Sequence, residues 1–160
     1  MKRKLISLFI CTLTLSIACS QNKKFPAPVG YVNDFDHVFS VQERKSLDSL
    51  ITAFEKETTV EIAVLTLDNT YCGIENFDSL VLSIHNEWGV GKEDKNNGVL
   101  IAICKQSRKM RINNGSGIEI KMTDEETRQI LNKEIFPEFR QDKYYEGVRK
   151  GIISIMKELR

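Results

Sequence analysis

Two apolar runs rich in β-branched residues constrain the fold of this chain most strongly. "VEIAVLTL" spans residues 60–67 and "GVLIAIC" spans residues 98–104. Nearly continuous apolar runs of this length are typical of strands that are buried on both faces of a sheet. Between them, at about residues 74–88, apolar side chains recur at helical spacing, and Gly89 follows as a helix stop. Strand, helix and strand in this order predict a right-handed parallel crossover.

The rest of the chain adds a third strand and three helices. The strand is expected at residues 108–113, and only residues 105–107 separate it from the second strand, so these two strands should form an antiparallel hairpin. Amphipathic helices are expected at about residues 40–57, 123–134 and 142–159, and capping boxes open the first two. Together these elements predict an α/β fold, a three-layer α/β/α sandwich with a small mixed sheet and helices on both faces.

Small residues and a proline mark the C-terminal part of the chain. Pro137 follows the helix predicted at residues 123–134 and is expected to interrupt the helical pattern. Gly147 and Gly151 lie one turn apart on the last helix, and small residues at this spacing indicate close contact between helices.

The first residues have the organisation of a secretion signal. Three basic residues precede an apolar run that is too short for a spanning helix, and Ala18-Cys19 then resembles a bacterial lipobox. We therefore expect a signal peptide at residues 1–18, a lipid-anchored tether at 19–30 and a folded domain at 31–160. Cys19 would carry the lipid, for example palmitate, and would hold the protein to a membrane of the cell envelope, facing the periplasm. Cleavage without lipid is the alternative.

Asn-Asn-Gly occurs twice, at residues 96–98 and 113–115. Because the third strand should run back along the second, both copies are expected at the same edge of the sheet. Acidic residues lie close to both copies in sequence, and amide and carboxylate oxygens on glycine-bent loops are the ligands that Ca²⁺ prefers. The alternative is that both copies supply left-handed turn residues, and this alternative is the favoured one.

Other reactive residues give weaker signals. Cys72 and Cys104 follow the ends of the two parallel strands, so a disulfide is geometrically conceivable, but two free buried thiols are the favoured expectation. Asp34 and Asp36 are interpreted as turn-capping residues, with metal ligation as the alternative. His85 lies beside an apolar stripe and is expected to be a packing or boundary residue. The sequence contains no motif for a catalytic nucleophile, so the catalytic residues stay unknown.

Several stretches resemble, in order, the TPM domain family. They include "PAPVGYVNDFDHVFS", "NEWGVGKEDKNNGVLIAI", "RKMRINNGSGIE" and "IFPEFRQDKYYEGVRKGI", and the resemblance covers residues 26–159. It implies an α/β/α domain that is tethered to a membrane and exposed outside the cytoplasm. Family members include plant thylakoid-lumen proteins linked to photosystem II repair and proposed to be acid phosphatases, and an auxiliary subunit of animal acetylcholine receptors.

The resemblance also implies a tentative metal site for Ca²⁺. Asp34 and Glu119 match acidic positions of the family, whereas the family's aspartate before the Asn-Gly pair is replaced by Asn96, beside Asn97. The loss of that charge should weaken any bound cation.

These expectations lead to one preferred function and two alternatives. The preferred one is an accessory or interaction module for membrane protein complexes, with the membrane, through the lipid, and membrane proteins as partners. The alternatives are a low-activity acid phosphatase that depends on a divalent cation, and a calcium-stabilised structural domain. A net charge of +1 gives no indication of nucleic-acid binding.

Overall fold

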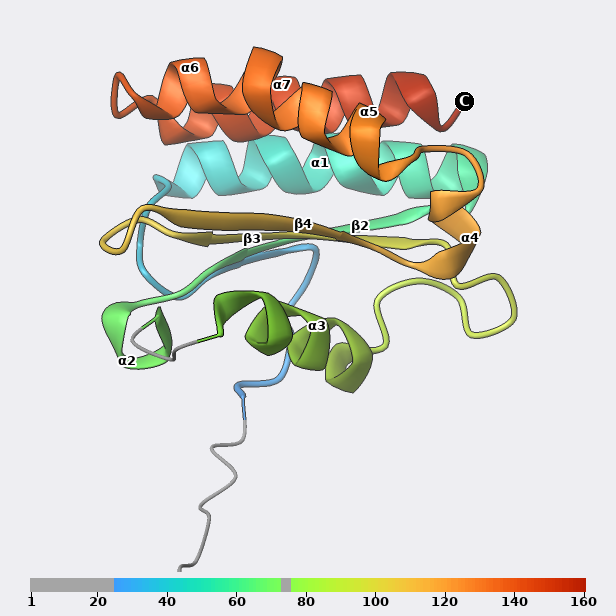
Figure 1. Ribbon diagram of the computed structural model, residues 1–160, viewed down its shortest axis with the longest axis horizontal. Coiled ribbons are helices and arrows are strands. Elements are labelled where there is room, and N and C mark those ends of the chain that lie inside the picture. The colour runs from blue at the N-terminus through green and yellow to red at the C-terminus, as the bar shows by residue number, and fades with distance from the viewer. Residues whose placement is uncertain (1–24, 73–75) are drawn as a thin grey trace, which may run out of the picture.

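A four-stranded mixed sheet forms the middle layer of the structure, a computed structural model that describes residues 25–72 and 76–160 (Figure 1). In order across the sheet, the strands are β1 (Val32–Asp34), β2 (Glu61–Thr66), β3 (Gly98–Cys104) and β4 (Lys109–Asn114). β1, β2 and β3 are parallel, and β4 is antiparallel to β3. The predicted crossover and hairpin are therefore confirmed. The predicted signal peptide, Cys19 and the first part of the tether lie outside the described residues.

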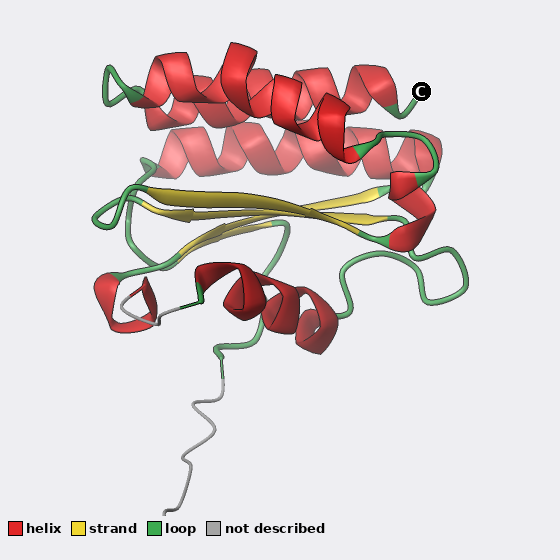
Figure 2. Ribbon diagram, viewed as in Figure 1, coloured by secondary structure: helices red, strands yellow, loops and turns green. Residues whose placement is uncertain are grey.

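Helices cover both faces of the sheet, which confirms the predicted three-layer sandwich (Figures 1 and 2). One face carries α1 (Val41–Thr58), α5 (Asp124–Ile130), the π-helical turn η1 (Leu131–Ile135), α6 (Phe136–Phe139) and α7 (Tyr144–Glu158). The other face carries α2 (Asn69–Cys72) and α3 (Phe77–Trp88), and α4 (Ser116–Glu119) follows β4 at the end of the sheet. Among the described residues, none of these helices has the length and apolarity needed to cross a membrane.

Alternation along the strands divides the interior into two cores. Ile62 and Val64 of β2 face the core below α1 and α7, whereas Ala63 and Leu65 face the core above α3. All seven residues of β3 are buried, as expected for a central strand covered on both faces. The two apolar runs in the sequence thus became the two inner strands.

β1 is a strand that the sequence did not predict. It has three residues, too few for an alternating pattern to stand out, and its pairing places Asp34 opposite Thr66. The buried side chain of Asn33 fixes the chain before the strand, because it accepts a hydrogen bond from the Val29 N–H at 2.8 Å and donates one to the Gly30 carbonyl at 2.8 Å. This edge strand therefore depends on tertiary contacts.

The chain around Pro137 stays helical, so the predicted interruption takes another form. α5 widens into η1 and continues into α6, and Pro137 lies in the first turn of α6, directly after this π-helical turn. The predicted close contact is confirmed: a Cβ at Gly147 would press on the Phe139 ring and one at Gly151 on the Ile135 side chain. The two glycines let α7 approach η1 and α6 closely.

Candidate functional site

The two Asn-Asn-Gly segments lie side by side at the amino end of β3, as their predicted topology required. The Gly115 N–H donates to the Gly98 carbonyl at 2.8 Å, and the Gly117 N–H donates to the Asn96 carbonyl at 3.0 Å. The pairing of β3 with β4 places Val99 opposite Asn114. Two loops separated by a whole hairpin in sequence thus form one surface.

The turn interpretation of these segments holds for Asn96 alone, whose φ of 46° is left-handed. Gly98 and Gly115 do not have a left-handed φ, so glycine is needed at these two positions for a different reason. A Cβ at Gly98 would overlap the Val90 carbonyl, and one at Gly115 would overlap the Asn96 carbonyl. The glycines let backbone segments touch, and this close approach shapes the surface.

A pocket of about 600 Å³ opens beside these loops. We call it the Asn-Gly pocket. Its walls come from the end of α3, from the loop that follows and from the turn into α4, and they include His85, Asn86, Glu93, Asn96, Asn114 and Ser116. The lining combines amide, carboxylate, hydroxyl and amine side chains with the apolar Leu82 and Val90, which suits a ligand with both polar and apolar groups.

Two residues that line this pocket each have a buried polar atom without a hydrogen-bond partner among the described residues. They are Nδ1 of His85, a residue only 7% exposed, and Oδ1 of Asn114, whose Nδ2 donates to Thr127 Oγ1 at 2.9 Å. Burial lowers the pKa of the His85 imidazole below its usual 6.5, so the ring is neutral at pH 7. The two atoms lie on opposite faces of the sheet, because Asn114 pairs with Val99 and reaches α5, whereas His85 belongs to α3.

His85 and Asn114 were not predicted as site residues. His85 is buried, as expected, but its unpartnered nitrogen depends on how α3 packs and leaves no mark in the sequence. Asn114 lies within the second Asn-Asn-Gly copy, so the repeated motif was the signal that could have identified it.

The structure brings together only some of the predicted metal ligands. Asn96 lines the Asn-Gly pocket, and Glu119 is exposed on α4 beside it. Asn97 is buried below the loop, where Oδ1 accepts from the Lys92 N–H at 2.9 Å and Nδ2 donates to the Thr59 carbonyl at 2.8 Å. Asn97 thus holds the loop in place, and its amide is already engaged.

Asp34 lies at the carboxyl end of β1, at the end of the strands opposite to the two Asn-Asn-Gly segments. Its side chain is 1% exposed and accepts hydrogen bonds from the Val38 and Phe39 N–H groups, from Thr66 Oγ1 at 2.6 Å and from Arg44. This is the turn-capping role preferred from the sequence. Asp34 therefore cannot share a cation with Asn96, and the four predicted ligands do not fit one site. Among residues 25–72 and 76–160, no cluster of three or more His, Cys, Asp or Glu could hold a metal ion.

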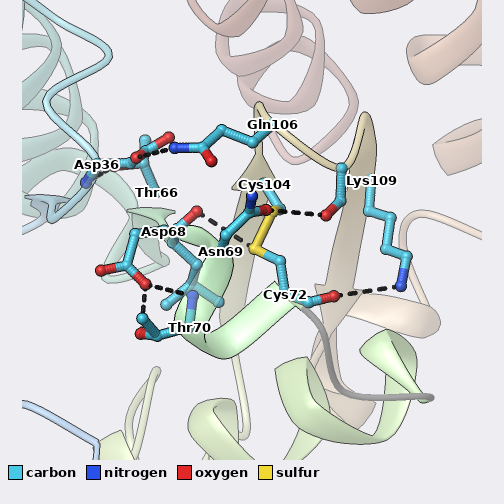
Figure 3. The surroundings of a disulfide bond; sticks show 11 residues. Asp36, Thr66, Asp68, Asn69, Thr70, Cys72, Cys104, Gln106 and Lys109 are labelled. Carbon is cyan, nitrogen blue, oxygen red and sulfur yellow. Dashed lines mark hydrogen bonds between the residues drawn. A yellow bond between two sulfur atoms is a disulfide. The ribbon is translucent and has the colours of Figure 1, made fainter.

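The expectation of two free thiols was wrong, because Cys72 and Cys104 form a disulfide (Figure 3). Cys104 ends β3, and the short helix α2 turns back so that the two Cα atoms lie 6.1 Å apart. Both residues are buried, and Lys109 Nζ donates to the Cys72 carbonyl at 3.3 Å. The single turn of α2 that brings the two sulfur atoms together is too short to recognise in sequence.

The fold agrees with the comparisons to known proteins. The family model described as the TPM domain matches residues 32–158, so the chain belongs to the TPM domain family. The N-terminal domain of a P. gingivalis protein, solved by solution NMR, is 28% identical over 81% of each chain, with a TM-score of 0.73. No curated protein matches this chain.

Two more distant structures share the fold alone. One is the BA42 protein of the psychrophilic bacterium Bizionia argentinensis, 20% identical, with a TM-score of 0.64 over 78% of this chain and 83% of that one. The other is the N-terminal domain of the cg2496 protein of Corynebacterium glutamicum, 13% identical, with a TM-score of 0.61 over 86% of this chain and 85% of that one.

Proposed function

We propose that this protein is an extracytoplasmic TPM-domain module, anchored to a membrane by a lipid on Cys19, that binds a membrane-protein partner through the Asn-Gly pocket. The observation that carries the proposal is the pocket of about 600 Å³ at the point where the two Asn-Asn-Gly segments meet. Its lining combines amide, carboxylate and hydroxyl side chains with the apolar Leu82 and Val90, so it presents polar and apolar groups to a ligand.

The chemistry of the lining favours a peptide segment as the ligand. The amide side chain of Asn96 and the hydroxyl of Ser116 can each donate and accept hydrogen bonds. Backbone amides of a partner offer matching donors and acceptors, and its apolar side chains can contact Leu82 and Val90. A protein loop is therefore the ligand that suits this lining.

The path of the N-terminal segment supports a partner in the membrane. Trp88 Nε1 of α3 donates to the Pro26 carbonyl at 3.1 Å, and the Phe25 and Tyr71 rings lie 5.9 Å apart. The chain thus leaves the domain on the α3 side (Figure 1). Residues 19–24 can span at most about 20 Å when extended. A lipid on Cys19 would keep the α3 layer, which contributes to the Asn-Gly pocket, close to the membrane surface.

Two alternative functions use the same pocket. Glu93 and Asn96 line it together with His85, and carboxylate and amide oxygens are the ligand types of a weakly held hard cation. In the low-activity phosphatase, the cation beside the imidazole would support slow hydrolysis of phosphomonoesters. In the calcium-stabilised domain, the cation would only stabilise the fold.

Turnover of a generic phosphomonoester separates the module from the phosphatase. We expect the full chain, purified in neutral detergent, to show the same background rate as its His85→Leu variant, with Ca²⁺, with Mg²⁺ and with EDTA. The reason is that the pocket holds no activated nucleophile. A cation-dependent rate at least tenfold above the His85→Leu rate would contradict the proposal and establish the enzyme. In the same preparations, a Ca²⁺-dependent rise of the melting midpoint that Asn96→Gly abolishes would establish the calcium-stabilised domain, because glycine keeps the left-handed backbone and removes the amide.

A further inference from the structure

A second pocket lies at the opposite edge of the sheet, between the β3–β4 turn and the segment that joins α6 to α7. Its volume is about 290 Å³. Four cationic side chains line it, namely those of Lys105, Arg108, Lys109 and Arg140. The lining also contains one carboxylate, that of Asp142. The remaining lining is largely apolar and aromatic, with Met110, Phe136, Phe139 and Tyr144. We call it the Arg108–Arg140 pocket.

The two arginines of this pocket make no salt bridge or side-chain hydrogen bond with the residues that the structure describes. Four other arginines do have carboxylate partners, namely Arg44, Arg111, Arg128 and Arg160. Lys109 Nζ is engaged by the Cys72 carbonyl, and Lys105 Nζ lies 4.9 Å from the centre of the Tyr144 ring. Two guanidinium groups therefore remain available to a ligand at one small pocket.

The backbone at this pocket is held in an uncommon conformation. Arg108 has a φ of 50° and Asp142 a φ of 58°, both in the left-handed region although neither residue is glycine. Such a conformation costs of order 1 kcal/mol or more per residue, and residues that adopt it are concentrated at functional sites. Here Arg108 in the β3–β4 turn and Asp142 in the α6–α7 connection both line the same cavity.

We propose that the Arg108–Arg140 pocket binds a small organic oxyanion, with its carboxylate or phosphate head on the two guanidinium groups and its apolar body against Phe136 and Phe139. A guanidinium group presents parallel N–H donors that match two oxygens of such a head. The cavity is near the lower limit for small-molecule sites, so it suits a ligand of about one ring. This site is separate from the Asn-Gly pocket and does not rest on its proposed function.

Phenylphosphonate is a suitable probe, because it carries a phosphate-like head on a ring and cannot be hydrolysed as an ester. We expect it to bind the full chain in neutral detergent by calorimetry, at least tenfold more tightly than inorganic phosphate, and phenol to show no binding. The double variant Arg108→Gln/Arg140→Gln should lose at least tenfold in affinity. Arg149→Gln, which removes an exposed charge elsewhere on α7, should bind like the unaltered protein.

Asp142→Asn supplies a test in the opposite direction. Asparagine tolerates the left-handed backbone as well as aspartate does, and the change removes the carboxylate that repels an anion. We expect it to tighten phenylphosphonate binding several-fold. The proposal is overturned if millimolar phenylphosphonate does not bind, if the double arginine variant binds it unchanged, or if Asp142→Asn weakens it. Competition by phosphatidylglycerol vesicles would also overturn it, since the ligand would then be a lipid headgroup.

Discussion

Gly98→Ala should lower the free energy of unfolding by about 3 kcal/mol or more, because backbone atoms leave no room for the added methyl group. A Cβ at Gly98 would overlap the Val90 carbonyl and the Gly91 nitrogen. Backbone groups cannot rotate away as a flexible side chain can, so either β3 or the loop over it must move. Urea denaturation followed by circular dichroism measures the change.

Gly30→Ala is the matched control for this substitution. A Cβ at Gly30 would meet only Asp48 Oδ1, at the ordinary contact distance of 3.6 Å. We expect its free energy of unfolding to stay within about 0.5 kcal/mol of that of the unaltered protein, as for a surface change. A Gly98→Ala protein as stable as Gly30→Ala would show that the loop and β3 do not touch as described. The Asn-Gly pocket would then lose its structural basis.

Removing the disulfide should have the second large effect. The bond joins residues 32 positions apart, and closing a loop of this size restricts the unfolded chain by about 3.5 kcal/mol in the chain-entropy model. For a domain of this size, that corresponds to a fall in the melting midpoint of about 10 °C. We expect this fall in Cys72→Ala/Cys104→Ala, measured by thermal melts without reductant.

Reductant provides the internal control for this prediction. Dithiothreitol should lower the melting midpoint of the unaltered protein toward that of Cys72→Ala/Cys104→Ala, and it should leave the midpoint of the double variant unchanged. This comparison removes any contribution from other thiols of the chain. An unaltered protein whose midpoint is the same with and without dithiothreitol would contradict a stabilising disulfide. The expectation of free thiols would then be restored.

Much of the fold could be predicted because its signals are local. β2 and β3 are long apolar runs, and the N-termini of α1 and α5 form the capping boxes that Ser40 with Glu43 and Thr123 with Glu126 predicted. β1 could not be predicted, because three residues carry no periodicity and their pairing depends on β2. The disulfide was missed for a related reason, since the turn of α2 that places Cys72 beside Cys104 is a tertiary feature.

The candidate site could be predicted in part, through topology. A hairpin must return its end to the edge where its first strand began, so the meeting of the two Asn-Asn-Gly copies followed from the order of the strands. Asp34 was grouped with them only by family resemblance. The parallel pairing of the unpredicted β1 places it at the other edge instead. His85 required knowledge of how α3 packs, which no sequence pattern supplies.

Photo-cross-linking from the Asn-Gly pocket in native membranes tests the central proposal most directly. A photoreactive amino acid replaces Ser116, which is exposed and lines the pocket, or Lys157, which is exposed near the carboxyl end of α7, in the helical layer on the other face of the sheet from α3. We expect a discrete adduct with one membrane protein, identified by mass spectrometry, from position 116 and none from position 157. Cys19→Ala should abolish palmitate labelling and the adduct together. Equal adducts from both positions, or none from position 116 in membranes that hold the protein, would contradict the proposed interaction module.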